Sequence, residues 1–285
     1  MEESKRVKKL RQDIIAAIPK FPNNRETKTK LEEMPLTTLL IHYLNWMSRY
    51  ISVKPRKIVI KPAITSDCRW RNLKLQIESL LEKARKGENL TPHLSTQPHS
   101  KGYTPKSSEK RPDVDRWADK DFLLNAMGFH HFHIGTELEP NGYIERTNDV
   151  IFAKVSREEF TAIGIFDHSV FEPTGEDMSP ERKRLWEIFD THITREVPPG
   201  SFVISSPIST SGHPIHLVSI AQEYSSVIRE IDPKLEDRKF VQDLYKGAGC
   251  EVPNKPKLEW ALKFSDLGIH EKNLNHFFVL RRGFN

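Results

Sequence analysis

The chain has 285 residues, enough to bury one large hydrophobic core or two smaller ones. Hydrophobic residues make up 37% and charged residues 29%, and no apolar run approaches the roughly 20 residues of a membrane-spanning helix, which excludes that class. The N-terminus has no apolar stretch typical of a secretory signal, and the only cysteines are Cys68 and Cys250. We therefore expect a cytoplasmic protein without a disulfide framework or a cysteine-based zinc site.

Positive charge is concentrated in the first part of the chain. Residues 1–118 carry 25 Lys and Arg against 13 Asp and Glu, a balance of +12, whereas residues 119–285 carry 19 against 26, a balance of −7. A basic half can bind a polyanion through phosphate contacts, although a lysine-rich solvated surface has the same composition. We expect RNA to be a partner, held through the basic N-terminal half.

The N-terminal part is predicted to be mostly helical. Leu10, Ile14 and Ile18 recur at helical spacing up to the prolines at 19 and 22, and a second, apolar helix is expected after Pro35, over about residues 36–51. Residues 56–62 are β-branched and bounded by prolines, which indicates a strand. A further helix over residues 71–86 is expected to end at Gly87.

The composition changes after Gly87. Residues 89–118 are rich in Pro, Ser, Thr and charge and contain few aliphatic side chains, which favours a linker or an exposed loop. We therefore divide the chain into a helical N-terminal region (1–88), a linker or exposed loop (89–118) and a histidine-rich α+β domain (119–285).

The second half is predicted to begin with a short helix capped by Asp119 and ended by Gly128. Strands follow over residues 129–135, 149–155 and 160–168, and their short connections favour a three-stranded antiparallel meander. A helix over about 180–194, a turn into residues 201–208, a helix over about 236–246 and a final strand at 276–280 complete the prediction. The fold class is α+β: a helical, basic N-terminal region, then a small antiparallel sheet flanked by helices.

Four histidines fall within the predicted meander. Because side chains alternate along a strand, His131 and His133 share one face, while His130 lies on the other. His168 ends the third strand directly after Asp167, whose carboxylate is positioned to orient an imidazole. Arg146 precedes the second strand. We expect His131, His133, Arg146 and His168 to converge on one surface.

Two imidazoles and a cation are the groups needed for RNA cleavage without a metal or other cofactor. One imidazole removes the proton of the ribose 2′-hydroxyl, another group protonates the leaving oxygen, and the cation stabilises the phosphorane. On this assignment His131 or His133 is the base, His168 the acid and Arg146 the cation.

The motifs HHFHIG, ERTNDVIF and IGIFDH, within residues 129–168, resemble the small bacterial ribonuclease toxins of the barnase/EndoU/RelE type. In that group such side chains lie on a small antiparallel sheet behind N-terminal helices. The resemblance, which covers about 40 residues, implies an endoribonuclease related to toxins or defence, and a protein inhibitor as a further partner.

Two other classes of function fit the sequence. His131, His133, Glu137 and the more distant His168 resemble the ligand pattern of cupin barrels, which implies a metal-binding protein. Alternatively, the chain is a non-enzymatic nucleic-acid or protein-binding module, and the basic residues that would contact phosphates are Arg49, Lys54, Arg56 and Lys57. Neither the oligomeric state nor the RNA class follows from the sequence.

Overall fold

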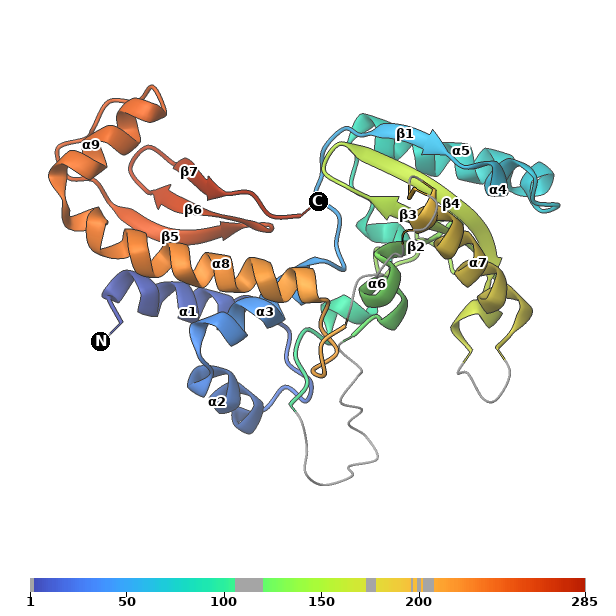
Figure 1. Ribbon diagram of the computed structural model, residues 1–285, viewed down its shortest axis with the longest axis horizontal. Helices are drawn as coiled ribbons and strands as arrows, with labels where there is room; N and C mark the ends of the chain where they lie inside the picture. The colour runs from blue at the N-terminus through green and yellow to red at the C-terminus, as the bar shows by residue number, and fades with distance from the viewer. Residues whose placement is uncertain are drawn as a thin grey trace. The chain divides into compact units, whose positions relative to one another are not determined.

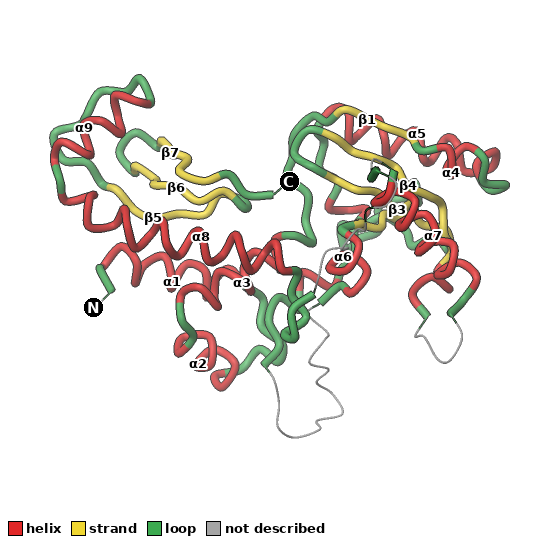
Figure 2. Tube along the Cα trace, in the orientation of Figure 1, coloured by secondary structure: helices red, strands yellow, loops and turns green. Residues whose placement is uncertain are grey.

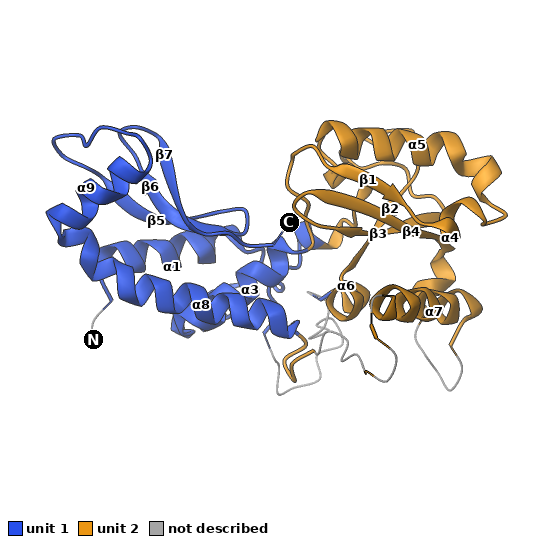
Figure 3. Cartoon of the chain, turned by 45° about the horizontal axis from the view of Figure 1, so that its top comes forward, with its two compact units in different colours: residues 1–48, 98–120, 213–284 blue, residues 49–97, 121–212, 285 orange. Residues whose placement is uncertain are grey.

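The computed structural model describes residues 3–105, 120–172, 178–195, 197–198, 201 and 208–284. The chain forms two compact units, coloured separately in Figure 3. Unit 1 comprises residues 1–48, 98–120 and 213–284, and unit 2 comprises residues 49–97 and 121–212 with residue 285. This division differs from the expected one, because the N-terminal helices belong to the same unit as the C-terminal quarter of the chain.

Unit 1 combines helices with a three-stranded antiparallel sheet in the order β5-β6-β7. Its elements are α1 (Lys5–Ala17), α2 (Arg25–Glu33), α3 (Leu36–Met47), α8 (Ile215–Ile231), the 3₁₀ helix η4 (Asp232–Glu236), α9 (Arg238–Gly247), β5 (Leu258–Lys263), β6 (Asp266–Glu271) and β7 (His276–Arg281). Figure 1 shows α1, α3 and α8 running beside this sheet.

Burial and one polar contact explain why the two ends of the chain share a unit. Leu10 and Ile14 of α1 are buried in the same core as Tyr224 of α8 and Trp260 of β5. Within that unit, Asp232 accepts hydrogen bonds from the Nε atom of Arg6 at 3.1 Å and from the indole of Trp260 at 2.8 Å. The apolar face predicted for the first helix is therefore buried against elements more than 200 residues away in sequence.

Unit 2 contains a four-stranded sheet in the order β1-β4-β3-β2. Its elements are β1 (Lys57–Ile60), α4 (Pro62–Thr65), α5 (Trp70–Lys86), the 3₁₀ helix η1 (Thr91–His93), α6 (Phe122–Met127), β2 (Phe129–His133), β3 (Asp149–Val155), β4 (Glu159–Asp167), the 3₁₀ helix η3 (His168–Phe171) and α7 (Pro180–Thr194). Strands β2, β3 and β4 form the predicted antiparallel meander, and β1 pairs with β4 in parallel. Figure 2 shows β1, β3 and β4 of this sheet in yellow.

The sheet of unit 2 is covered on both faces, with α5 on one side and α6 and α7 on the other (Figure 3). Alternating side chains of β2 enter different cores: Phe132 packs with Ile77 and Leu80 of α5, whereas Phe129 packs with Phe189 of α7. The period-two alternation therefore places His131 and His133 on the α7 side, together with Phe129. This burial on both faces fixes the register of β2.

The predicted α+β fold class is confirmed, and the individual elements match unevenly. The helix expected over 36–51 ends at Met47, and the helix expected over 71–86 is α5, which ends at Gly87 as predicted. Asp121, rather than Asp119, caps α6. Asp119 lies outside the described residues, as do positions 106–118 of the expected linker and 202–207 of the segment expected after the turn. The long helix α8 and the strands β5 and β6 were not predicted.

No helix in the described part of the chain combines the length and the apolar character needed to cross a lipid bilayer. This result agrees with the sequence, in which no apolar run is long enough for a membrane-spanning helix.

Two glycines that end helices of unit 2 provide a test of the packing. Gly87 and Gly128 both have positive φ, 75° and 70°, so alanine at either costs about 1 kcal/mol in backbone strain. A Cβ atom at Gly87 would also lie 2.3 Å from the backbone nitrogen of Pro55, whereas at Gly128 it would meet nothing within 4 Å. We expect Gly87→Ala to reduce the free energy of unfolding by clearly more than Gly128→Ala in urea denaturation. Equal losses would show that the segment before β1 is not packed against the end of α5.

Candidate functional site

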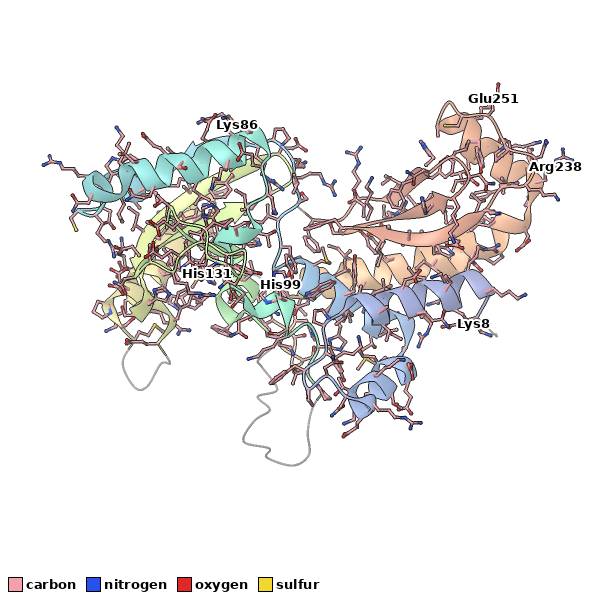
Figure 4. The ribbon with its side chains drawn as sticks, turned by 180° about the vertical axis from the view of Figure 1, so that it is seen from behind. Lys8, Lys86, His99, His131, Arg238 and Glu251 are labelled. Atoms are coloured by element: carbon pink, nitrogen blue, oxygen red, sulfur yellow. The ribbon has the colours of Figure 1, made fainter. Side chains whose placement is uncertain are left out.

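Strand β2 presents two imidazoles to one face of the sheet. His131 lies opposite Phe152 of β3, and His133 lies opposite Val150. The ring centroids of His131 and His133 are 6.0 Å apart. Figure 4 labels His131 among the side chains that surround this sheet.

The third imidazole belongs to His168, the first residue of η3, which directly follows β4. The rings of His168 and His133 are nearly parallel, with centroids 5.6 Å apart, and Phe171 lies 4.8 Å from the ring of His131 and 5.7 Å from that of His168. The four residues His131, His133, His168 and Phe171 thus form one cluster, which we call the histidine cluster. His131 and His133 lie in β2, whereas His168, which was predicted to end the third strand, lies with Phe171 in η3.

A backbone carbonyl, and not Asp167, orients His168. The Nδ1 atom of His168 lies 2.8 Å from the carbonyl oxygen of Asn148, so Nδ1 carries a proton and donates it. In the neutral ring Nε2 is then the basic nitrogen. The carboxylate of Asp167 instead accepts hydrogen bonds from the backbone and the hydroxyl of Ser169, and Asp167 thereby caps η3. The expected role of Asp167 as an orienting carboxylate is therefore wrong.

Arg146 joins the histidine cluster through His133. Its guanidinium places one NH group 3.2 Å from Nε2 of His133 and another 3.2 Å from the hydroxyl of Thr96. A guanidinium only donates, so Nε2 of His133 accepts and the proton of the neutral ring is on Nδ1. That Nδ1 atom is buried and has no hydrogen-bond partner among the described residues. Arg146 itself is largely exposed.

Burial keeps His133 uncharged. The residue is 2% exposed, and desolvation, together with the charges of His131 and Arg146, lowers its pKa to about 3. His133 is therefore neutral at physiological pH and cannot donate a proton as an acid. Its position instead makes it a support for Arg146.

His131 is less deeply buried, with 14% of its side chain exposed. Burial lowers the pKa of His131, and the carboxylate of Asp121, whose Oδ2 lies 3.8 Å from Nδ1, opposes the shift. Asp121 also caps α6 by accepting a hydrogen bond from the backbone of Leu124. The result is a neutral imidazole beside one acidic group.

Sequence reasoning missed a second layer of residues behind the histidine cluster. Nδ1 of His93 donates to the carbonyl oxygen of His133 at 2.8 Å, and Nε2 of His93 accepts from the ammonium of Lys83 at 3.0 Å. His93 is 3% exposed, and burial lowers its pKa. It lies in the segment assigned to a linker. The signal in the sequence that indicates a packed segment here is the pair Leu90 and Leu94, four residues apart, and both are buried.

The basic residues expected to contact nucleic acid do not form a phosphate-binding surface. Arg56 is 4% exposed, and its guanidinium donates to the backbone oxygens of Ser52, Lys54 and Ser156. Arg49 is also buried. The ammonium of Lys54 lies 3.0 Å from the carboxylate of Glu158, which partly neutralises it. Of the four, Lys57 alone is exposed. Burial of both arginines removes the basis for this interface.

The alternative metal site is not assembled either. Within the ranges that the structure describes, no group of three or more His, Cys, Asp or Glu side chains is arranged to hold a metal ion. Glu137 is exposed, and Nε2 of His133 faces a guanidinium, which repels a cation. His131, His133, Glu137 and His168 therefore do not act as a ligand set in this arrangement.

Comparison with known proteins identifies no relative. No protein-family model, no curated protein and no solved structure matches the chain. The function must be argued from the histidine cluster itself.

The buried neutral state of His133 predicts a pH-dependent stability. An imidazole in the unfolded chain binds a proton near pH 6.5, whereas His133 in the folded chain binds one only near pH 3, so stability falls as the pH drops through this window. Between pH 6.5 and 5 the contribution of this one group is about 2 kcal/mol. We expect His133→Gln, which retains an acceptor for Arg146, to flatten the pH dependence of the unfolding free energy measured by urea denaturation. An unchanged slope would mean that His133 titrates normally.

Proposed function

We propose that unit 2 is a metal-independent endoribonuclease in which His131 and His168 transfer protons and Arg146 stabilises the phosphate. One observation carries the proposal. Three imidazoles lie close together, with the centroids of neighbouring rings no more than 6.0 Å apart. The guanidinium of Arg146 lies 3.2 Å from Nε2 of one of them, His133. These groups suffice for cleavage that uses the 2′-hydroxyl of the substrate as its nucleophile.

The burial of His131 and the hydrogen bond from Nδ1 of His168 suggest their roles. Neutral His131 takes the proton of the 2′-hydroxyl as the 2′-oxygen forms a bond to phosphorus. The bond from phosphorus to the 5′-oxygen breaks, and protonated His168 donates from Nε2 to that oxygen while Nδ1 remains bonded to Asn148. The products are a 2′,3′-cyclic phosphate and a free 5′-hydroxyl. The reaction needs neither water nor a metal ion in this step.

Arg146 and His133 act on the charge that develops at phosphorus. The guanidinium of Arg146 is exposed, so it can donate to the equatorial oxygens of the phosphorane, where preorganised charge has its largest effect. His133 does not touch the substrate in this scheme and is a positioning residue for Arg146. The sequence left the general base open between His131 and His133, and in this scheme the base is His131.

The biological setting is part of the same proposal. We propose RNA as the substrate, a role related to toxins or defence, and a protein inhibitor as a partner, all on the resemblance of residues 129–168 to ribonuclease toxins. Cys68 and Cys250 are both free, which fits a reducing cytoplasm.

Substitution of His168 and of Arg146 tests the proposed chemistry. We expect His168→Ala and Arg146→Ala each to lower kcat/KM for cleavage of a labelled oligoribonucleotide by about 10²–10⁴-fold, the usual contribution of such groups. The control is His192→Ala, a histidine of α7 outside the histidine cluster, which should retain activity. Addition of EDTA should have no effect, and a substrate with 2′-deoxyribose throughout should remain intact. Loss of activity with EDTA, or full activity in His168→Ala, would refute the proposal.

The pH profile tests the assignment of His131 as the base. Asp121 raises the pKa of His131, so its removal lowers that pKa further, and a base loses activity as the pH falls through its pKa. Asp121→Asn retains the ability to cap α6. We expect this variant to shift the acidic limb of kcat/KM to lower pH, whereas Glu145→Gln, which removes an exposed carboxylate of the same unit, should not. An acidic limb that stays in place in Asp121→Asn would contradict the assignment.

A further inference from the structure

Unit 1 contains an open cavity of about 940 Å³ between α1, α2 and the segment that joins them. Five of its lining side chains are cationic: Lys8, Arg11, Lys20, Arg25 and Lys28. Glu32 is the one carboxylate among the described lining residues. Lys8 is labelled on α1 in Figure 4. Five cations of the N-terminal helices and their connection thus line one concave surface.

The neighbouring acids neutralise only part of this charge. Arg11 donates to the backbone oxygens of Glu32 and Met34, and its Nε lies 3.4 Å from the carboxylate of Glu3. Lys28 lies 3.7 Å from Glu32, a long and exposed contact that contributes little. Within the described chain, Arg25 has no ion-pair partner. The cavity therefore retains the charge of Arg25 and most of that of Lys28.

One lining lysine, Lys20, lies near another positive charge. Lys20 is half-buried and donates to the carbonyl oxygens of Ile15 and Ile18 at the end of α1. Burial and the nearby charge of Lys28 lower the pKa of Lys20. A bound anion would relieve the repulsion between these two ammonium groups, which gives the cavity a physical reason to take one.

The composition of the lining indicates which anion. No aromatic side chain of the described chain lines the cavity, so it offers no stacking platform for a base. Its polar side chains are cations and amides, which suit phosphate oxygens. The cavity is larger than a single phosphate needs, and it is open to solvent, so a chain can enter and leave it.

We infer that this cavity of unit 1 binds the phosphate backbone of a single-stranded nucleic acid, without selecting its bases. The site is separate from the histidine cluster and uses only residues of α1, α2 and their connection. It does not rest on the proposed ribonuclease activity, since a strand is bound through its phosphates whether or not it is cleaved.

The experiment uses the full-length protein and a short fluorescein-labelled oligothymidylate, which has no 2′-hydroxyl and cannot be cleaved by the proposed reaction. Fluorescence anisotropy gives the dissociation constant over a range of salt concentrations. The test variant is Arg25→Glu with Lys28→Glu, both exposed on α2. The matched control is Lys246→Glu with Lys255→Glu, which changes the net charge equally at exposed positions of unit 1 outside the cavity lining.

Loss of two phosphate contacts on a single strand should reduce the slope of log K against log salt by about 1.4 and weaken binding about 25-fold at 0.1 M salt. We expect at least this effect in the cavity variant and a much smaller one in the control. Inorganic pyrophosphate should displace the oligonucleotide only at far higher concentrations than the unlabelled strand.

Three results would overturn the inference: no binding by the unaltered protein, equal weakening in the cavity variant and the control, or pyrophosphate binding as tightly as the strand. The last would assign the cavity to a small phosphorylated compound. His168→Ala separates the two proposals, because it should strongly reduce cleavage of RNA and leave binding of oligothymidylate unchanged.

Discussion

The hydrogen bond from Arg146 to His133 controls how the histidine cluster can act. A guanidinium donates and never accepts, so the bond exists only while Nε2 of His133 is unprotonated. Burial enforces that state by lowering the pKa of His133 to about 3. The partner of Arg146 is therefore neutral, and the charge of Arg146 remains available. A carboxylate in the place of His133 would have neutralised that charge.

The histidine cluster is attached to a firmly held end of the sheet. Asp67, at the junction of α4 and α5, receives hydrogen bonds from Arg69 and Arg184, and both arginines also donate to the carbonyl oxygen of Ile165 in β4. Burial alone would raise the pKa of Asp67, but the hydrogen bonds and charge of Arg69 outweigh it and lower that pKa to about 2. This network joins the helices on the two faces of the sheet at the end of β4, from which His168 emerges. Such support favours a fixed geometry for the side chains of the histidine cluster.

The sequence predicted the parts of unit 2 that depend on local signals. Alternation along residues 129–133 was enough to place His131 and His133 on one face, and short polar connections were enough to predict the antiparallel meander. Parallel pairing of β1 with β4 joins segments about 100 residues apart and has no local signal. The hairpin of β5 and β6 was missed for a specific reason: its turn places Phe264 at φ 57°, where Asn or Gly is the usual indicator. His93 was missed because the composition around it resembles a linker.

The charge asymmetry acquires a different meaning once the units are known. The division at residue 118 gave +12 and −7, but unit 1 carries 26 Lys and Arg against 20 Asp and Glu, a balance of +6, and unit 2 carries 18 against 19, a balance of −1. The acidic residues of 213–284 offset the basic N-terminal helices within one unit. Net charge therefore does not separate a nucleic-acid-binding part from a catalytic part. What the N-terminal region retains is local: five cations and one carboxylate line a single cavity. A field of that kind decays within about 10 Å at 0.1 M salt, so it acts on a phosphate that enters the cavity and not on a distant strand.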